Sequence, residues 1–271
     1  MTTAQKIIKY LAIAFAIALI VGIISSIASL FGMFYIFDRA TDGGGEIGEM
    51  TEIFDEEFSS LEIEVGAASL TIETGEHFSV LCNNSAVTAK KKGETLEITE
   101  KSNAWIQSKN ESALTVILPE GTVLQNFDLD IGAGRIVITH LTAETVEIDI
   151  GAAKLEAEYL CAKKRIDADL GAGDFTIRAG YLKSPDFDLG VGKTTITATV
   201  DGDGDFDCGV GEVDLTIYGS PADYTIRASR GIGDVRVDGR SVSDGDVIGN
   251  GSHTVRISGG VGSVSVSFLQ D

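Results

Sequence analysis

A glycine-centred phrase recurs along the chain at an almost constant spacing, and this repeat constrains the fold more than any other feature. Five clear copies run from DLDIGAGRIVI at Asp128 to DFDCGVGEVDL at Asp205. Their central glycines, spaced 19 or 20 residues apart, are Gly132, Gly151, Gly171, Gly190 and Gly209. Weaker copies surround Gly66, Gly231 and Gly260. A fixed period near 20 residues is typical of a solenoid, in which each repeat forms one coil.

Each copy has the same internal pattern. The residues one and three places before the glycine are apolar, as in Ile131 and Leu129, and those two and four places before it are acidic. This period of two predicts a strand with one buried face, and a second alternating strand follows the glycine. Glycine suits the corner because it has no Cβ to collide with the next coil. We therefore predict an all-β fold, a β-solenoid of roughly 19–20-residue two-strand coils.

The N-terminal segment has a different character. No charged residue occurs from Tyr10 to Phe37, which is long enough for a helix to cross a bilayer. Lys6 and Lys9 precede it, so the positive-inside rule predicts a cytoplasmic N-terminus and an extracytoplasmic C-terminal domain. We expect a single-pass cell-membrane protein with the lipid bilayer as partner. The alternative is a signal peptide cleaved near Ser26 and Ala28, which would leave the apolar stretch SLFGMFYIF at the new terminus.

The sequence predicts five segments in all. They are a cytoplasmic stub (1–9), one transmembrane α-helix (10–37), an acidic stalk (38–60), irregular N-terminal coils of the β domain (61–126) and regular β-solenoid repeats with a C-terminal cap (127–268). A loop around Trp105 interrupts the irregular coils. Terminal coils are expected to differ from the others, because an open coil would expose a strand edge to aggregation.

Composition excludes several functions. The chain has 41 Asp and Glu against 21 Lys and Arg, for a formal charge of -20, so nucleic acid and anionic membrane surfaces are disfavoured partners. Three cysteines without a C-x-x-C pair suggest neither a disulfide framework nor a zinc site. Cys208 takes an apolar inward position and is expected to be a buried filler. The three histidines are scattered, and no nucleophile motif is present, so we predict no enzyme and no required cofactor.

The acidic positions of the repeat supply the one candidate site. If the coils stack in register, ten outward carboxylates form two ladders: Asp128, Asp130, Glu147, Asp149, Asp167, Asp169, Asp186, Asp188, Asp205 and Asp207. Two like charges 4 Å apart repel by about 1 kcal/mol in water and more near a protein surface. One interpretation is a face that binds Ca²⁺ or Mg²⁺, since hard cations prefer carboxylate oxygens. The other is a solvated face that prevents aggregation. The run DGDGD at 201–205 matches a calcium loop only partly and is expected to be a polar corner.

The repeat phrases D-[LA]-D-[IL]-G-A-G, LTVILPEG and GNGSHTVRISGGVGSVSV resemble a bacterial family of unknown function labelled "putative adhesin", whose domains are of the toast-rack type. The resemblance covers about Leu61 to Phe268. It implies a membrane-associated, extracytoplasmic β-solenoid without a family active site. Many relatives occur beside envelope-stress regulators of Gram-positive bacteria.

Three classes of function remain open from the sequence. The favoured one is an anchored module for cell-envelope interaction or stress sensing, with an unidentified envelope protein or polymer as partner. A self-assembling scaffold of the bactofilin kind is the alternative. A polysaccharide-acting β-helix enzyme is the third, although short corners leave little wall for a substrate cleft.

Overall fold

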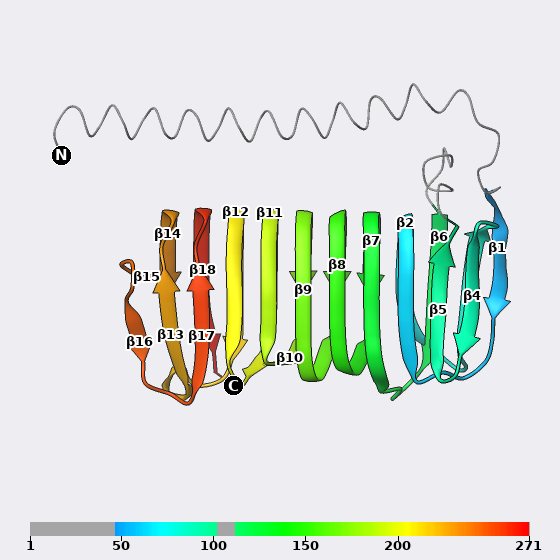
Figure 1. The fold of residues 1–271 in the computed structure, drawn as a ribbon. Helices are drawn as coiled ribbons and strands as arrows, with labels where there is room; N and C mark the ends of the chain where they lie inside the picture. The colour runs from blue at the N-terminus through cyan, green and yellow to red at the C-terminus, as the bar shows by residue number, and fades with distance from the viewer. Residues whose placement is uncertain (1–46, 102–111, 271) are drawn as a thin grey trace, which may run out of the picture. The chain divides into compact units, whose positions relative to one another are not determined.

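The computed structural model describes residues 47–101 and 112–270, and this part of the chain is built almost entirely from β-strands (Figure 1). Six long strands form the body: β2 (Ser60–Gly75), β7 (Leu124–Ile138), β8 (Leu141–Ala157), β9 (Leu160–Ile177), β11 (Pro185–Asp201) and β12 (Gly204–Tyr218). Shorter strands form the rungs next to the ends: β5 (Thr95–Glu100), β6 (Ser112–Pro119), β13 (Tyr224–Ser229), β14 (Ile232–Val237), β17 (His253–Ser258) and β18 (Val261–Leu269). The remaining elements are β1 (Ile47–Phe54), β3 (Ser79–Asn84), β4 (Val87–Lys92), β10 (Gly180–Lys183), β15 (Arg240–Ser241), β16 (Val247–Gly249) and the 3-10 turn η1 (Pro221–Asp223).

The long strands stack in parallel, one per coil, and the all-β solenoid prediction is confirmed. Leu129 in β7 pairs with Ile148 in β8, and Ile148 pairs with Ala168 in β9. The same register continues through β11 and β12, so residues one repeat apart lie side by side. Figure 1 shows these strands as successive rungs along one axis.

The coil differs in detail from the predicted pair of strands. Each long strand bends at its glycine and continues, so both predicted strands belong to one element. A short third side joins the coils, and the inward residues on it are fully buried: Leu124, Ala143, Ala162, Leu182 and Val200. The sequence pattern hid this side because it is only a few residues long and its inward residues vary in size, as Ala143 and Leu182 show.

The corners of neighbouring coils lie almost in backbone contact. A Cβ on Gly151 would overlap the carbonyl oxygen of Gly132, and the same relation continues through the column of corner glycines. Two residues after the corner glycine Gly190, Gly192 has φ +141 and lies against the carbonyl of Gly173 in the preceding coil. Glycine adopts this conformation at the least cost, and it recurs at Gly134, Gly173, Gly211 and Gly262, which explains the recurring Gly-x-Gly phrase. Ala68 and Ala153 occupy the equivalent position in two coils, without a positive φ.

The inward side chains form one continuous aliphatic core. The residues three places before each corner glycine stack from coil to coil, and Phe187 and Phe206 lie parallel with ring centroids 5.4 Å apart. Ala168 occupies the equivalent position in the preceding coil, where the bulky Phe175 and Phe187 fill the interior. The small side chain of Ala168 in one coil is therefore compensated by large core side chains in its own and the next coil.

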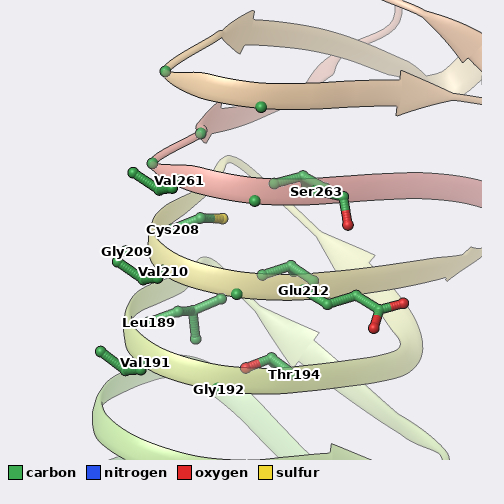
Figure 2. Close-up of a pocket in the computed structure, with 18 of the residues that line it drawn as sticks. Leu189, Val191, Gly192, Thr194, Cys208, Gly209, Val210, Glu212, Val261 and Ser263 are labelled. Atoms are coloured by element: carbon green, nitrogen blue, oxygen red, sulfur yellow. The ribbon is translucent and has the colours of Figure 1, made fainter. Parts of the chain in front are cut away.

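Near the C-terminal end the core residues become smaller. Thr194 replaces the large residue found at its position in earlier coils, and Leu189 is followed by Cys208 in the next rung. Figure 2 shows these side chains beneath the corner, while Val191, Val210 and Val261 point away from it. A cavity of about 20 Å³ remains there, room for a single water molecule.

At the N-terminal end, spatial order departs from chain order. Strand β2 lies between β7 and a rung made of β5 and β6, although the chain reaches β5 and β6 only after leaving β2. Strands β3 and β4 then cover this rung in antiparallel pairing. The last turn of parallel stacking is thus closed by hairpins, and Lys90, Lys91 and Lys92 are exposed on β4. Lysines on an edge strand oppose edge-to-edge aggregation.

The predicted acidic stalk over 38–60 needs correction in its described part. Residues Ile47–Phe54 form strand β1, which pairs antiparallel with β3. Ile53 and Phe54 pack against the core, and the Phe54 ring contacts Phe58 at a centroid distance of 6.1 Å. These apolar side chains were too few to show a period among the acids, yet they are enough to dock the strand.

The C-terminal end contains an inserted rung. Strands β17 and β18 lie between β12 and the outermost parallel rung, β13 and β14, although they follow both in the chain. The short strands β15 and β16 cover that outermost rung in antiparallel pairing. The sequence predicted a repeat at Gly231 and another at Gly260, but their order along the axis is reversed.

No helix in the described ranges is long and apolar enough to cross a membrane. The predicted cytoplasmic stub and transmembrane helix (10–37), and the loop around Trp105, lie outside the described residues.

The corner geometry predicts a sharp difference between adjacent substitutions. Gly192→Ala places a Cβ against the Gly173 carbonyl at a φ that disfavours side chains, so we expect it to lower the free energy of unfolding by about 3 kcal/mol or more. Val191→Ala removes only exposed methyl groups and should change it by less than about 0.5 kcal/mol. Urea unfolding followed by circular dichroism compares the two. Equal stability of both variants would contradict the corner account.

Candidate functional site

The stacking gathers the predicted carboxylates into two parallel columns on the strand face before the corners. The bridged column holds the acids four places before each glycine: Glu62, Asp128, Glu147, Asp167, Asp186 and Asp205. The groove column holds those two places before it: Glu64, Asp130, Asp149, Asp169, Asp188 and Asp207. All ten residues singled out from the sequence lie in these columns, directly paired with their counterparts in neighbouring coils.

Two further members, Glu62 and Glu64, were missed by the sequence analysis. They belong to β2, which pairs with β7 across a gap of 66 residues in the chain. The signal was present in the phrase EIEVGAASL before and after Gly66, but β3 to β6 separate it from the regular repeats. Glu97 in β5 extends the bridged column by one more coil, opposite Glu62.

Basic side chains interrupt the bridged column and close both of its ends. Arg165 Nη2 lies 2.6 Å from Asp167 Oδ2 and 3.4 Å from Asp186 Oδ2. Arg256 in the inserted rung lies 3.2 Å from Asp205, and Lys92 lies 2.5 Å from Glu97 at the opposite end.

Arg227 in β13 follows Arg256 in the register, so a second arginine extends the basic end of the bridged column. It lies one rung further out than the sequence order suggested, because the inserted rung places Arg256 before it. Arg230, just after β13, is exposed, and its backbone N–H donates to Asp244 Oδ1 at 2.9 Å.

The groove column has no basic partner within the described parts of the chain. None of its six carboxylates takes part in an ion pair there, and the column ends at the neutral residues Ser258 and Thr99. Four of its members, together with the corner glycines beside them, line an open groove along the stack: Asp149, Asp169, Asp188 and Asp207. This groove therefore has a glycine floor and one wall of uncompensated negative charge.

The pKa values reflect this crowding. Partial burial and the charges of Asp130 and Asp169 raise the pKa of Asp149 above its ordinary range. Partial burial, with Asp169 and Asp207 on either side, does the same for Asp188. A carboxyl whose pKa is higher in the folded state favours folding at low pH, and that contribution is lost as the pH rises through the folded value. Asp149 and Asp188 therefore favour folding less at neutral pH than at low pH.

The outward strand face after the corners, called here the balanced face, carries paired charges of both signs. Glu156 lies 2.7 Å from Arg135, 3.3 Å from Lys154 and 3.7 Å from Arg178, and these cations lower its pKa. Lys193 lies 3.3 Å from Glu212 in the next coil and 3.6 Å from Asp214. The two faces share the same coil spacing, so the contrast between them comes from side-chain charge alone.

The columns do not form a closed metal cage. Within the described residues, no group of three or more His, Cys, Asp or Glu side chains converges closely enough to hold an ion. The ladder is instead a line of carboxylates one rung apart, suited to a mobile row of cations or to a row of positive groups on a partner. Its role as a cation site stays a prediction.

The other sequence candidates resolve as structural features. The DGDGD run forms the corner between β11 and β12, where Asp203 Oδ1 accepts the Thr254 N–H at 3.0 Å. Cys208 is half-buried rather than fully buried, because the inserted rung presents only Gly259 beside it. Burial and the neighbouring Asp207 raise the pKa of its thiol to about 12, so it is not a reactive thiolate.

Comparison with known proteins gives structural likeness only. No family model matches the sequence, and no curated protein matches it. Solved structures similar to this chain include a "putative adhesin" from Bacteroides fragilis, 11% identical with a TM-score of 0.46, covering 80% of this chain and 96% of that one. A "putative cell adhesion protein" from Clostridium sporogenes is 15% identical with a TM-score of 0.33, covering 82% and 98%. A "putative lipid binding protein" from Parabacteroides distasonis is 14% identical with a TM-score of 0.37, covering 84% and 98%.

At these identities and TM-scores, neither a binding partner nor an activity is transferred to this chain. A second protein from Parabacteroides distasonis and one from Parabacteroides merdae are also described as adhesins. Three of these five structures are thus named "putative adhesin", the label of the family that the repeat phrases resemble.

Proposed function

We propose that this protein is a non-catalytic cell-envelope module, anchored in the membrane by residues 10–37, whose solenoid presents an acidic groove to cations or to a positively charged partner. The observation that carries the proposal is the groove column. It places six carboxylates in register, four of them along an open groove, and none of the six forms an ion pair within the described chain.

The energetic argument favours a ligand over a merely solvated face. Negative charges held one rung apart repel each other, and Arg165 and Arg256 offset this repulsion in the adjacent column but not in the groove column. A cation between neighbouring carboxylates would remove this repulsion. Ca²⁺ suits the site because it tolerates irregular oxygen coordination and retains water ligands.

Two features support a binding module over the alternatives. The coil interior is filled by aliphatic side chains, and the acidic groove is an open surface beside the corner glycines rather than an enclosed substrate cleft. Against a self-assembling scaffold stand the antiparallel strands at both ends, which cover the parallel rungs on which a second copy would stack.

Calcium-dependent melting tests the groove directly. For the full chain in detergent, we expect millimolar CaCl₂ to raise the melting temperature by about 3 °C or more relative to NaCl of equal ionic strength, because cations relieve the repulsion. The triple variant Asp149→Asn, Asp169→Asn, Asp188→Asn should melt higher without calcium and lose the response.

A matched control removes three charges from the balanced face through Asp174→Asn, Glu212→Gln and Asp214→Asn. This variant should keep the full calcium response. Equal responses of both triple variants, or an unchanged melting temperature in the wild type, would show that the groove is a passive acidic face.

Membrane anchoring is tested by fractionation. The full chain should sediment with membranes and resist extraction by high salt and alkaline carbonate, and its solenoid should be cleaved by protease added outside intact spheroplasts. Release into the soluble fraction after N-terminal cleavage near Ser26 or Ala28 would instead identify the segment as a signal peptide.

A further inference from the structure

The inserted C-terminal rung is held at its first residue by a histidine. His253 begins β17 and pairs with Tyr224 in β13, and its ring contacts the Tyr224 ring at a centroid distance of 5.5 Å. On its other side it reaches the corner between β11 and β12, where the Gly202 N–H donates to His253 Nδ1 at 2.9 Å. The next residue, Thr254, donates its N–H to Asp203 in the same corner.

This hydrogen bond fixes the protonation state of the ring. An imidazole nitrogen that accepts an N–H carries no proton, so His253 is neutral, with its proton on Nε2. A proton on Nδ1 would face the Gly202 N–H and abolish the bond. The His253 side chain is 31% exposed, so protons reach it from solvent.

A carboxylate that could accept a hydrogen bond from a protonated His253 lies close to the same ring nitrogen. Asp201 Oδ1 is 3.8 Å from His253 Nδ1. The other oxygen of that carboxylate, Oδ2, accepts from Lys183 Nζ at 2.9 Å and from the Tyr181 hydroxyl, and these donors lower the pKa of Asp201. Asp201 therefore stays charged in mild acid and can receive a proton-bearing Nδ1.

We propose that His253 is a pH-sensitive latch for the inserted rung. Above the range in which imidazoles titrate, His253 binds the β11–β12 corner through Gly202. Below that pH range, the protonated ring turns to donate to Asp201. The Gly202 N–H then loses its acceptor, and the start of β17 loosens from the corner.

The charged and titratable groups around the ring are consistent with this exchange. They are Asp201 from β11, Lys183 and Tyr181 from β10, Asp203 from the corner, Tyr224 from β13 and Asp223 from η1. Lys183 Nζ lies 2.9 Å from Asp201 Oδ2, so the cation nearest this carboxylate is paired with the oxygen that does not face His253. The latch acts at the first residue of β17, whereas the groove is bordered by Ser258 at the other end of that strand.

Hydrogen exchange of the full chain in detergent, followed by mass spectrometry, tests the latch. In the wild type, the protection of the Gly202 amide, corrected for intrinsic exchange, should fall about fivefold between about pH 7.5 and about pH 5.5, the loss expected for one net hydrogen bond. The Thr254 amide, whose acceptor is a carboxylate, should change less.

Two variants make the result decisive. In His253→Asn, the side-chain oxygen can accept from Gly202 at every pH, so protection should stay constant. In Asp201→Asn, the protonated ring loses its charged acceptor, and the fall should move to lower pH. Constant Gly202 protection in the wild type, or the same fall in His253→Asn, would overturn the proposal; should His253→Asn fail to fold, the wild type and Asp201→Asn decide.

Discussion

Close backbone stacking at the corners is the constraint on which this structure depends. The carbonyl of one corner glycine occupies the space that a side chain on the next would need, from Gly66 through Gly132 and onward along the stack. Such proximity leaves no freedom to slide, because a shift of one residue would drive a Cβ into a carbonyl and turn every inward side chain outward. The corners therefore set the register, and the register determines the core and the surface together.

The acidic columns follow from that register. A repeat that places an acid two residues before each glycine must place like charges in a line once the glycines align. The chain resolves the conflict differently in its two columns. The bridged column contains Arg165 and ends at Arg256 and Lys92, whereas the groove column has no such partner in the described chain. This difference in ion pairing, rather than net charge, distinguishes the groove column from the bridged column.

The regular part of the fold could be predicted because its sequence pattern repeats within each coil and from one coil to the next. Period-two alternation identifies inward and outward residues, and a constant spacing identifies coils, so Leu129, Ile148 and their equivalents were placed correctly in the core. The ten ladder residues followed from the same reasoning. The ends could not be predicted in this way, since they depend on pairing between distant segments. Glu62 joins the ladder across 66 residues. Strands β17 and β18 enter between β12 and the outermost rung, where Arg256, Ser258 and Val261 are in register with both neighbours.

The order of the last three rungs tests the account most directly. Val210, Val261 and Ile232 are outward corner residues in three successive rungs, so Val210 and Val261 lie about 4.8 Å apart, and Val210 and Ile232 about twice as far. Spin labels on each pair, introduced as cysteines in a chain lacking Cys82, Cys161 and Cys208, report these separations by electron paramagnetic resonance. The account predicts strong spin–spin broadening for the 210–261 pair, 51 residues apart in sequence, and weaker broadening for the 210–232 pair. Stronger broadening for 210–232 would contradict the inserted rung and the register that places it.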